Sequence, residues 1–216
     1  MVYYYFLWFE LLSFMVAIIC YRFLKGSNLF WFIPFLLLTN IQEWGSHYGL
    51  FSDIEGANTI SINIFTSIEF LFYSWLFSRE VENPALKKVI IVSGFILFIS
   101  IVLNLLFFQG IYIFHLYTYL PGSILMVVFA CLYFFNILLR DEYVRLINLP
   151  MFWVCVGLLL FYTGMFSTYM FIMKSTRPIG YDYKQLYNIL SNIFNIILYS
   201  CFIISFLCQR LRKATS

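Results

Sequence analysis

One carboxylate stands in the middle of a run that is otherwise suited to hydrocarbon. Residues 66–75 read TSIEFLFYSW, and Thr66 and Tyr73 lie one helical turn to either side of Glu69. An ionisable side chain inside a bilayer costs several kcal/mol unless it is paired, protonated or hydrated. Glu69 is therefore predicted to face the interior of a helix bundle or a water-filled cavity.

Polar side chains recur at helical spacing in other apolar runs of the chain. Residues at i, i+3 or i+4 and i+7 lie on one face of a helix, so each set predicts a polar stripe. The stripes are Asn40, Glu43 and His47; His115, Tyr119 and Ser123; Asn188, Asn192, Asn195 and Tyr199; and Thr163 with Ser167. The candidate ligand-binding residues drawn from them are Glu43, His47, Glu69, Tyr73, His115, Tyr119, Asn192 and Asn195.

The same residues have a structural interpretation that stays open here. Asn, Ser and Thr commonly form hydrogen bonds of about 1 kcal/mol between packed membrane helices. A carboxylate is a costly way to make such a bond, which favours function for Glu43 and Glu69. The segment EWGSHYGLF also fits an aromatic belt at headgroup depth, with Trp44, His47 and Tyr48 in the interface.

The composition of the chain indicates that these polar residues are carried by membrane helices. The chain of 216 residues is 63% hydrophobic, 23% aromatic and only 11% charged, and its mean hydropathy is +0.89. Soluble domains do not reach these values, so we expect an all-α integral membrane protein in contact with the lipid bilayer and without nucleic-acid partners. The abundance of Phe, Tyr, Ile and Asn is typical of a coding sequence of low GC content, and we expect a bacterial cytoplasmic (inner) membrane.

A spanning helix needs about 20 mostly apolar residues, and the chain offers seven such stretches with short connections. They predict a single seven-transmembrane helix bundle over residues 1–216. The predicted spans are roughly 3–21, 29–50, 59–78, 88–108, 112–139, 149–173 and 184–208. Span four carries few polar residues, which predicts a peripheral position.

The distribution of basic residues predicts the orientation of this bundle. The loops after spans one, three and five and the C-terminal tail hold Arg22, Lys25, Arg79, Lys87, Lys88, Arg140, Arg145, Arg210, Arg212 and Lys213. The opposite side holds only Lys174, Arg177 and Lys184. Because Lys and Arg concentrate in cytoplasmic loops, we expect the N-terminus outside and the C-terminus in the cytoplasm.

Short segments of similar sequence suggest an internal repeat. LFWFIPFLLL in span two resembles MFWVCVGLLL in span six at one constant offset, and similar echoes link span one to five and span three to seven. They predict two parallel three-helix units joined by span four, a 3+1+3 arrangement that small transporters use.

The depth of each polar residue follows from its distance, at 1.5 Å per residue, to the predicted outer end of its span. By this count the polar stripes concentrate in the outer half and centre of the bundle. This predicts an outward-facing polar and aromatic pocket that binds or senses a small hydrophobic or cationic ligand, with a cytoplasmic or membrane protein as a further partner. One alternative is a small proton-coupled transporter in which Glu69 carries the proton. Another is an intramembrane enzyme whose metal is held by Glu43, His47 and Glu69. No catalytic residues and no cofactor are predicted.

Overall fold

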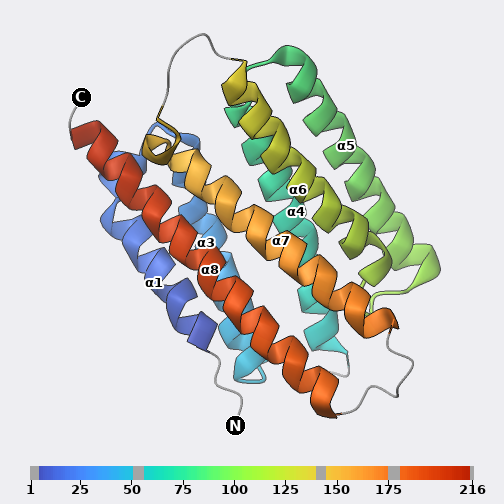
Figure 1. The fold of residues 1–216 in the computed structure, drawn as a ribbon. Coiled ribbons are helices and arrows are strands. Elements are labelled where there is room, and N and C mark those ends of the chain that lie inside the picture. Colours follow the sequence, from blue (N-terminus) through green and yellow to red (C-terminus); the bar gives the residue numbers. More distant parts are fainter. Residues whose placement is uncertain (1–4, 51–55, 140–144, 175–180, 215–216) are drawn as a thin grey trace. The chain divides into compact units, whose positions relative to one another are not determined.

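The structure is a computed structural model, and it describes residues 5–50, 56–139, 145–174 and 181–214. Every secondary-structure element in these ranges is a helix (Figure 1), as the sequence predicts. The chain divides into two compact units: unit 1 comprises Met1–Phe30 and Val144–Ser216, and unit 2 comprises Trp31–Tyr143. Each unit is described by itself below.

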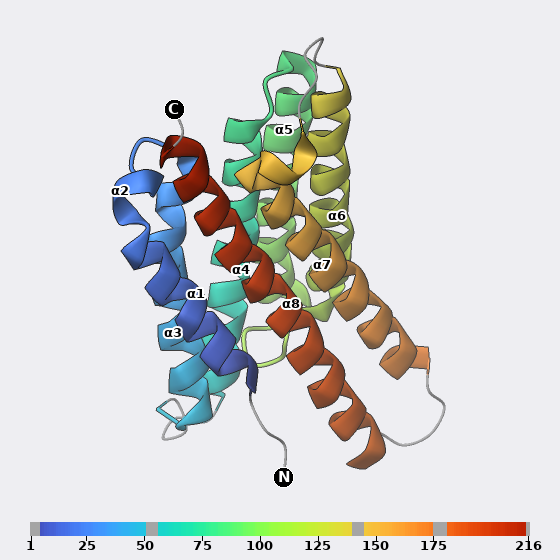
Figure 2. The same cartoon turned by 60° about the vertical axis from the view of Figure 1, so that its left-hand side comes forward.

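Unit 1 is built on its last helix. Its elements are α1 (Tyr5–Ile19), α2 (Tyr21–Leu24), η3 (Leu146–Asn148), α7 (Pro150–Lys174) and α8 (Tyr181–Ala214), and a 3₁₀ turn, η1 (Asn28–Trp31), lies at the boundary between the units. α8 packs against α7 on one side and against α1 and α2 on the other (Figure 2). Apolar side chains such as Leu158, Phe202 and Phe206 are fully buried.

Two glycines of α7 set the close packing of α8 in unit 1. A Cβ atom at Gly157 would lie 2.8 Å from the Cβ atom of Cys201, and at Gly164 the ring of Phe194 takes up the space of a side chain. The two glycines are seven residues apart and therefore lie on the same face of α7. Small residues that let helices approach closely are typical of membrane bundles.

Unit 2 is built around α4. Its elements are α3 (Phe32–His47), α4 (Ala57–Glu80), α5 (Pro84–Leu103), the π-turn η2 (Asn104–Phe108) and α6 (Leu116–Leu138). α4 packs against α3, α5 and α6, and it buries Phe70, Tyr73, Leu76 and Phe77.

Local signals set the ends of α5. The side-chain oxygen of Asn83 accepts hydrogen bonds from the backbone N–H groups of Ala85 at 3.0 Å and Leu86 at 3.2 Å, and Pro84 follows as the first helical residue. At the other end the helix widens into η2, where the N–H of Gln109 donates to the carbonyl of Asn104 at 2.9 Å.

Five helices of the described residues are long and apolar enough to cross a membrane. They are Ala57–Glu80, Pro84–Phe108, Leu116–Leu138, Pro150–Met173 and Gln185–Ala214, which correspond to the predicted spans three to seven. The chain is therefore an integral, multi-pass membrane protein of helices. The helix Pro84–Phe108 is the least buried of the five, because only 28% of the residues in its most apolar stretch are buried. This low burial agrees with the expectation that span four is peripheral.

The first two predicted spans differ from these five. α1 is apolar but has only 15 described residues, and α3 has 16 residues that include Asn40, Gln42 and Glu43. Predicted span 29–50 also begins with a 3₁₀ turn, and its α-helix ends at His47. The seven-span count and the orientation stay predictions.

The predicted 3+1+3 repeat is not reflected in the compact units. Unit 1 groups α1 with α7 and α8, while unit 2 groups α3 to α6. A parallel repeat would instead favour packing among the first three spans. The repeat stays a prediction, and the units follow tertiary packing rather than chain order.

Candidate functional site

The candidate site lies in unit 2, where α4 faces the irregular segment that precedes α6. The side chain of Asn63 is buried on α4. Its Nδ2 donates to the carbonyl of Ile111 at 3.0 Å and to that of Ile113 at 2.9 Å, and its Oδ1 accepts from the backbone N–H of His115 at 3.2 Å. One amide therefore satisfies three backbone groups of a segment that has no helical partners of its own.

The imidazole of His115 is fully buried at the start of α6. Its Nδ1 lies 2.9 Å from Oγ1 of Thr118, and that hydroxyl also lies 3.1 Å from the carbonyl of His115. If the hydroxyl proton goes to the carbonyl, Nδ1 must carry the ring proton and Nε2 is an acceptor. If the hydroxyl donates to Nδ1, Nε2 is the donor.

In either tautomer, Nε2 of His115 is buried and has no hydrogen-bond partner among the described residues. Most buried polar atoms in proteins are hydrogen-bonded to protein or to ordered water, so this nitrogen has the capacity for one further hydrogen bond.

A network of polar side chains surrounds Thr118 and closes this end of unit 2. Asn104 donates to Oε1 of Gln109 at 2.7 Å and to Oγ1 of Thr118 at 3.4 Å. Oε1 of Gln109 also accepts from the backbone N–H of Tyr117 at 3.1 Å. These residues satisfy one another, and Nε2 of His115 stays without a hydrogen-bond partner, as do other buried polar atoms of the described part of unit 2, such as Nε2 of Gln42 and Nδ2 of Asn136.

Aromatic rings flank the imidazole. The centroid of Phe114 lies 5.2 Å from those of both His115 and Tyr119, and the ring of Tyr119 lies 5.9 Å from that of Phe70. Tyr119 and Ser123, the other members of the predicted His115 stripe, are buried as well. The faces of these rings offer a surface that attracts cations.

Two further polar contacts join α3 to α4 in the residues that precede Asn63. Ser61 donates to Oε1 of Gln42 at 2.6 Å, and Ser46 donates to Oδ1 of Asn58 at 2.8 Å. Glu43, the candidate next to Gln42, is half-buried.

The residues of the predicted polar stripe along α3 differ in burial. Asn40 is buried and donates to the carbonyl of Leu36 at 2.8 Å, whereas His47 is exposed. The ring of His47 lies 5.2 Å from that of Tyr48, which stacks on Trp44 at 5.7 Å. This cluster matches the aromatic-belt interpretation of the segment better than a buried ligand site.

Glu69 lies at the contact of α3 and α4. It is half-buried and sits one turn from Phe65 and Phe72, whose rings stack on Phe35 of α3 at 6.2 Å and 4.1 Å. Tyr73, one turn further along α4, is almost fully buried. Glu69 therefore lies on α4 between residues that pack against α3 within unit 2.

The two asparagine candidates lie in unit 1, on α8. Asn192 is buried and donates to the carbonyl of Asn188 at 2.7 Å, and Asn195 donates to the carbonyl of Ser191 at 2.9 Å. Both amides thus bond to their own helix. The other six candidates belong to unit 2, and a pocket common to all eight stays a prediction.

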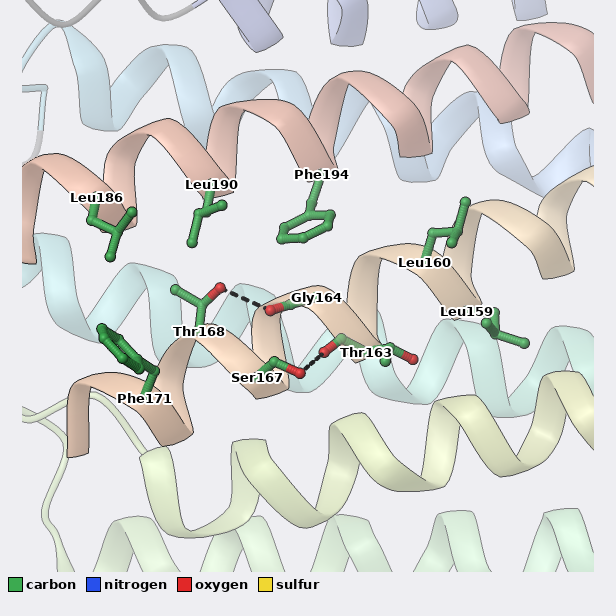
Figure 3. A pocket seen from close by; sticks show the side chains of 10 residues that line it. All are labelled: Leu159, Leu160, Thr163, Gly164, Ser167, Thr168, Phe171, Leu186, Leu190 and Phe194. Atoms are coloured by element: carbon green, nitrogen blue, oxygen red, sulfur yellow. Dashed lines mark hydrogen bonds between the residues drawn. The ribbon is translucent and has the colours of Figure 1, made fainter. Parts of the chain in front are cut away.

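A groove of about 610 Å³ runs between α7 and α8 of unit 1 (Figure 3). Two hydroxyls of its lining bond to their own helix: Ser167 donates to the carbonyl of Thr163 and Thr168 to that of Gly164, both at 2.8 Å. Apart from Thr163, the remaining lining is apolar, from residues such as Leu190. The hydroxyl of Ser167 thus bonds within its own helix, and the groove offers mainly hydrocarbon contact.

A second groove, of about 510 Å³, lies between α3 and α4 of unit 2. Its lining consists of apolar and aromatic side chains, among them Trp31, Phe35, Phe72 and Trp75. None of the eight candidates lines either groove.

The metal-dependent alternative is not supported by the arrangement of its proposed ligands. Among the described residues, no three His, Cys, Asp or Glu side chains come close enough to hold a metal ion. Glu43, His47 and Glu69 are therefore not found as a three-ligand set, and His47 is exposed with its ring beside that of Tyr48.

Buried polar residues also occur toward the predicted cytoplasmic ends, where the sequence suggested largely apolar halves. In unit 2, the side-chain oxygen of Asn136 accepts from the backbone N–H of Asn83 at 3.1 Å. In unit 1, Ser205 and Gln209 of α8 are buried. Buried polar residues are therefore not confined to the predicted outer half and centre, as the stripes would suggest.

Sequence reasoning missed Asn63, Gln42, Thr118 and Gln109. Asn63 precedes Thr66 by three residues and thus belongs to the stripe of Glu69, so helical spacing alone could have found it. Gln109 lies in a short connection whose role depends on tertiary contacts, and no local pattern marks it.

Comparison with protein-family models, curated proteins and solved structures finds no match for this chain. Inferences about its function therefore depend on the geometry above.

Proposed function

We propose that this multi-pass membrane protein binds a small ligand at the cluster formed by Asn63, His115 and Thr118, and that binding serves a sensing role. The proposal depends on one observation. The ring of His115 is fully buried, its Nδ1 is engaged with Thr118, and its Nε2 has no partner among the described residues. The neighbouring amides satisfy backbone and side-chain groups, so a ligand would meet a pre-positioned imidazole.

The surroundings favour an amine or hydroxyl on an otherwise apolar ligand. A neutral imidazole with its proton on Nδ1 offers a lone pair at Nε2, which accepts from an ammonium or hydroxyl group. The rings of Phe114 and Tyr119 add an aromatic surface for a cation. Glu43 and Glu69 belong to the same unit and contribute negative charge.

A sensing role is supported by the contacts that His115 makes with two helices. The backbone of His115 is bonded to Asn63 of α4, while its side chain is bonded to Thr118 of α6. A ligand on Nε2 would therefore favour one arrangement of α4 against α6, and a difference in affinity between two arrangements is what a sensor needs.

Thermal unfolding of the protein in lipid nanodiscs tests the proposal, with benzylamine, benzyl alcohol and benzoate as probes of one shape and three charges. We expect benzylamine, and more weakly benzyl alcohol, to raise the melting temperature of the wild type, and benzoate to leave it unchanged. The shift should vanish in His115→Leu and persist in Ser100→Ala, whose hydroxyl only bonds to the carbonyl of Ile96 in its own helix.

Thr118→Val offers a second variant in case His115→Leu does not fold, because it removes the partner of Nδ1 and keeps the imidazole. Its response to benzylamine should weaken. Equal responses in all variants, or no response to any probe, would count against the site. So would density at Nε2 that fits a single water in a high-resolution structure of the protein with benzylamine.

Proton-coupled transport is the second candidate, and the buried polar groups toward the predicted cytoplasmic ends favour it. Asn136 in unit 2 and Ser205 in unit 1 are buried, and both belong to the predicted cytoplasmic ends of spans five and seven, where an outward-facing receptor needs no polar groups. Proteoliposomes with an imposed pH gradient should then accumulate benzylamine, and Glu69→Gln should stop the accumulation. Binding without accumulation would leave the sensor as the better account.

A further inference from the structure

One end of unit 1 gathers six basic side chains from segments far apart in the sequence. We name as the basic end of unit 1 the residues Arg22, Lys25, Arg145, Arg210, Arg212 and Lys213, all of which are exposed. Arg22 and Lys25 follow α1, Arg145 precedes η3, and the remaining three lie in the last turns of α8. All six belong to the set that the charge distribution predicts to be cytoplasmic.

Contacts between side chains and backbone hold these segments together. The guanidinium of Arg210 lies 5.8 Å from the ring centroid of Phe23 in α2, and Nζ of Lys213 donates to the carbonyl of Lys25 at 2.8 Å. The thiol of Cys208 contacts the carbonyl of Ile147 in η3 at 3.8 Å. Figure 2 shows α2 beside the C-terminal end of α8. The charges are therefore fixed near one another by the fold and do not depend on a flexible tail.

Acidic side chains are scarce among the described residues at this end; Asp141 and Glu142, which precede Arg145 in the sequence, lie outside them. Among the residues of unit 1 whose side chains the structure describes, Glu10 is the one carboxylate, and it is buried in α1. Twelve residues separate it from Arg22, which is about 18 Å along a helical chain. The described side chains of unit 1 therefore give the basic end an excess of positive charge.

Exposed apolar side chains alternate with these charges. Ile19 is 66% exposed, Tyr21 45% and Leu211 67%. An acidic soluble protein would gain little from such neighbours, whereas the headgroup region of a bilayer accommodates apolar side chains and cations together.

We propose that the basic end of unit 1 is a binding surface for anionic phospholipids, whose phosphate groups lie between the cations of α2 and those at the end of α8. The acyl chains then lie along the exposed apolar side chains of the same helices. The partner is a lipid of the surrounding leaflet and not a soluble phosphate, because the apolar neighbours contribute only when acyl chains are present.

Nanodiscs that contain phosphatidylglycerol and phosphatidylcholine in equal amounts, with identical acyl chains, test this surface. The protein is released from them, and native mass spectrometry gives the ratio of the two lipids that remain bound. We expect phosphatidylglycerol to be enriched on the wild type. Each basic residue at an anionic surface contributes about fivefold, so the triple variant Arg22→Gln, Lys25→Gln, Arg210→Gln should lower the enrichment by at least about tenfold.

The matched control removes three charges from the same predicted side of unit 2, in Arg79→Gln, Lys87→Gln, Lys88→Gln. The adjoining chain there holds Glu80 and Glu82, so this variant should change the ratio little. The double variant Arg22→Lys, Arg210→Lys keeps the charge and should retain the enrichment, which separates loss of charge from loss of fold.

Three results would overturn the proposal. Equal losses in the two triple variants would indicate general attraction to the leaflet without a dedicated surface. Competition by excess glycerol phosphate as strong as that by the lipid would indicate a site for free phosphate. Binding of a poly-glutamate peptide that depends on these residues, without enrichment of phosphatidylglycerol, would indicate an acidic protein partner.

Discussion

The side-chain oxygen of Asn63 in α4 accepts a hydrogen bond from the backbone N–H of His115, at the start of α6, at 3.2 Å. Fifty-two residues of chain separate the two, so the bond is a tertiary contact that positions the imidazole from outside its own helix. The same amide donates to two carbonyls of the segment before α6. Asn63 is therefore the residue on which the geometry of the candidate site depends.

Asn63→Ala should destabilise unit 2 by at least about 2 kcal/mol, because it leaves two carbonyls and one N–H without their partner in a buried setting. Chemical unfolding in detergent, followed by tryptophan fluorescence, measures the loss. Ser100→Ala is the matched control and should stay within about 0.5 kcal/mol of the wild type. An Asn63→Ala protein as stable as this control would show that water replaces the amide.

Gly122→Ala tests the close packing of α6 on α4. A Cβ atom at Gly122 would lie 2.7 Å from a ring carbon of Phe70, so the ring must move at a cost of about 1–3 kcal/mol. Adding Phe70→Leu should remove part of that cost, since the smaller side chain frees the space. Unfolding of the two single variants and the double variant gives the coupling. Strictly additive effects would contradict direct contact between the two residues.

The helical class and the positions of spans three to seven follow from the sequence, because bilayer thickness and apolar run length constrain both. The burial of Tyr119 and Ser123 also follows, since helical spacing places them on one face with His115. The polar side chains in α3 explain why the second span is hard to judge from composition. They pair with Ser61 and Asn58 of α4, which local sequence does not reveal.

The grouping of helices into units could not be predicted from chain order. Unit 1 joins α1 to helices that begin more than a hundred residues later, and the packing depends on particular small residues. Gly157 and Gly164 of α7 admit Cys201 and Phe194 of α8. A glycine in an apolar run gives no indication of which helix will approach it.

Topology provides a further prediction, motivated by the ten basic residues on one side against three on the other. A reporter enzyme active only in the cytoplasm should work when fused to the C-terminus, and one active only outside should not. A reporter placed in the connection 51–55, between α3 and α4, should show the opposite pattern. The reverse outcome for both fusions would invert the bundle and put the His115 cluster on the cytoplasmic side.

The acidic residue Glu43 should attract cationic ligands to the predicted outer mouth, together with Asp53 and Glu55, which lie outside the described residues. If so, binding of benzylamine should weaken at high salt, where the Debye length falls from about 10 Å to about 3 Å. It should weaken again in Glu43→Gln. Benzylamine binding that ignores both changes would favour the aromatic-belt account of this segment.

Two substitutions of Glu69 distinguish a structural from a functional role, because they remove different properties of the side chain. The residue lies one helical turn from Phe65 and from Phe72, whose rings stack on that of Phe35. Glu69→Gln keeps the shape and most hydrogen bonds while it removes the exchangeable proton, whereas Glu69→Leu removes both. If Glu69 only joins helices, Gln should preserve stability and the response to benzylamine, and Leu should lower stability.

If Glu69 acts as a proton carrier or as a counter-charge for the ligand, the Gln variant should unfold at the temperature of the wild type yet lose either the benzylamine response or its dependence on pH. Thermal unfolding at several pH values, with and without benzylamine, distinguishes these cases. Thr66→Val is the matched control, since Thr66 is buried one turn away on the same helix and carries no titratable group. A Glu69→Gln protein that is folded and responds as the wild type across the pH range would assign this carboxylate to helix packing, because nothing but its proton and charge has been removed.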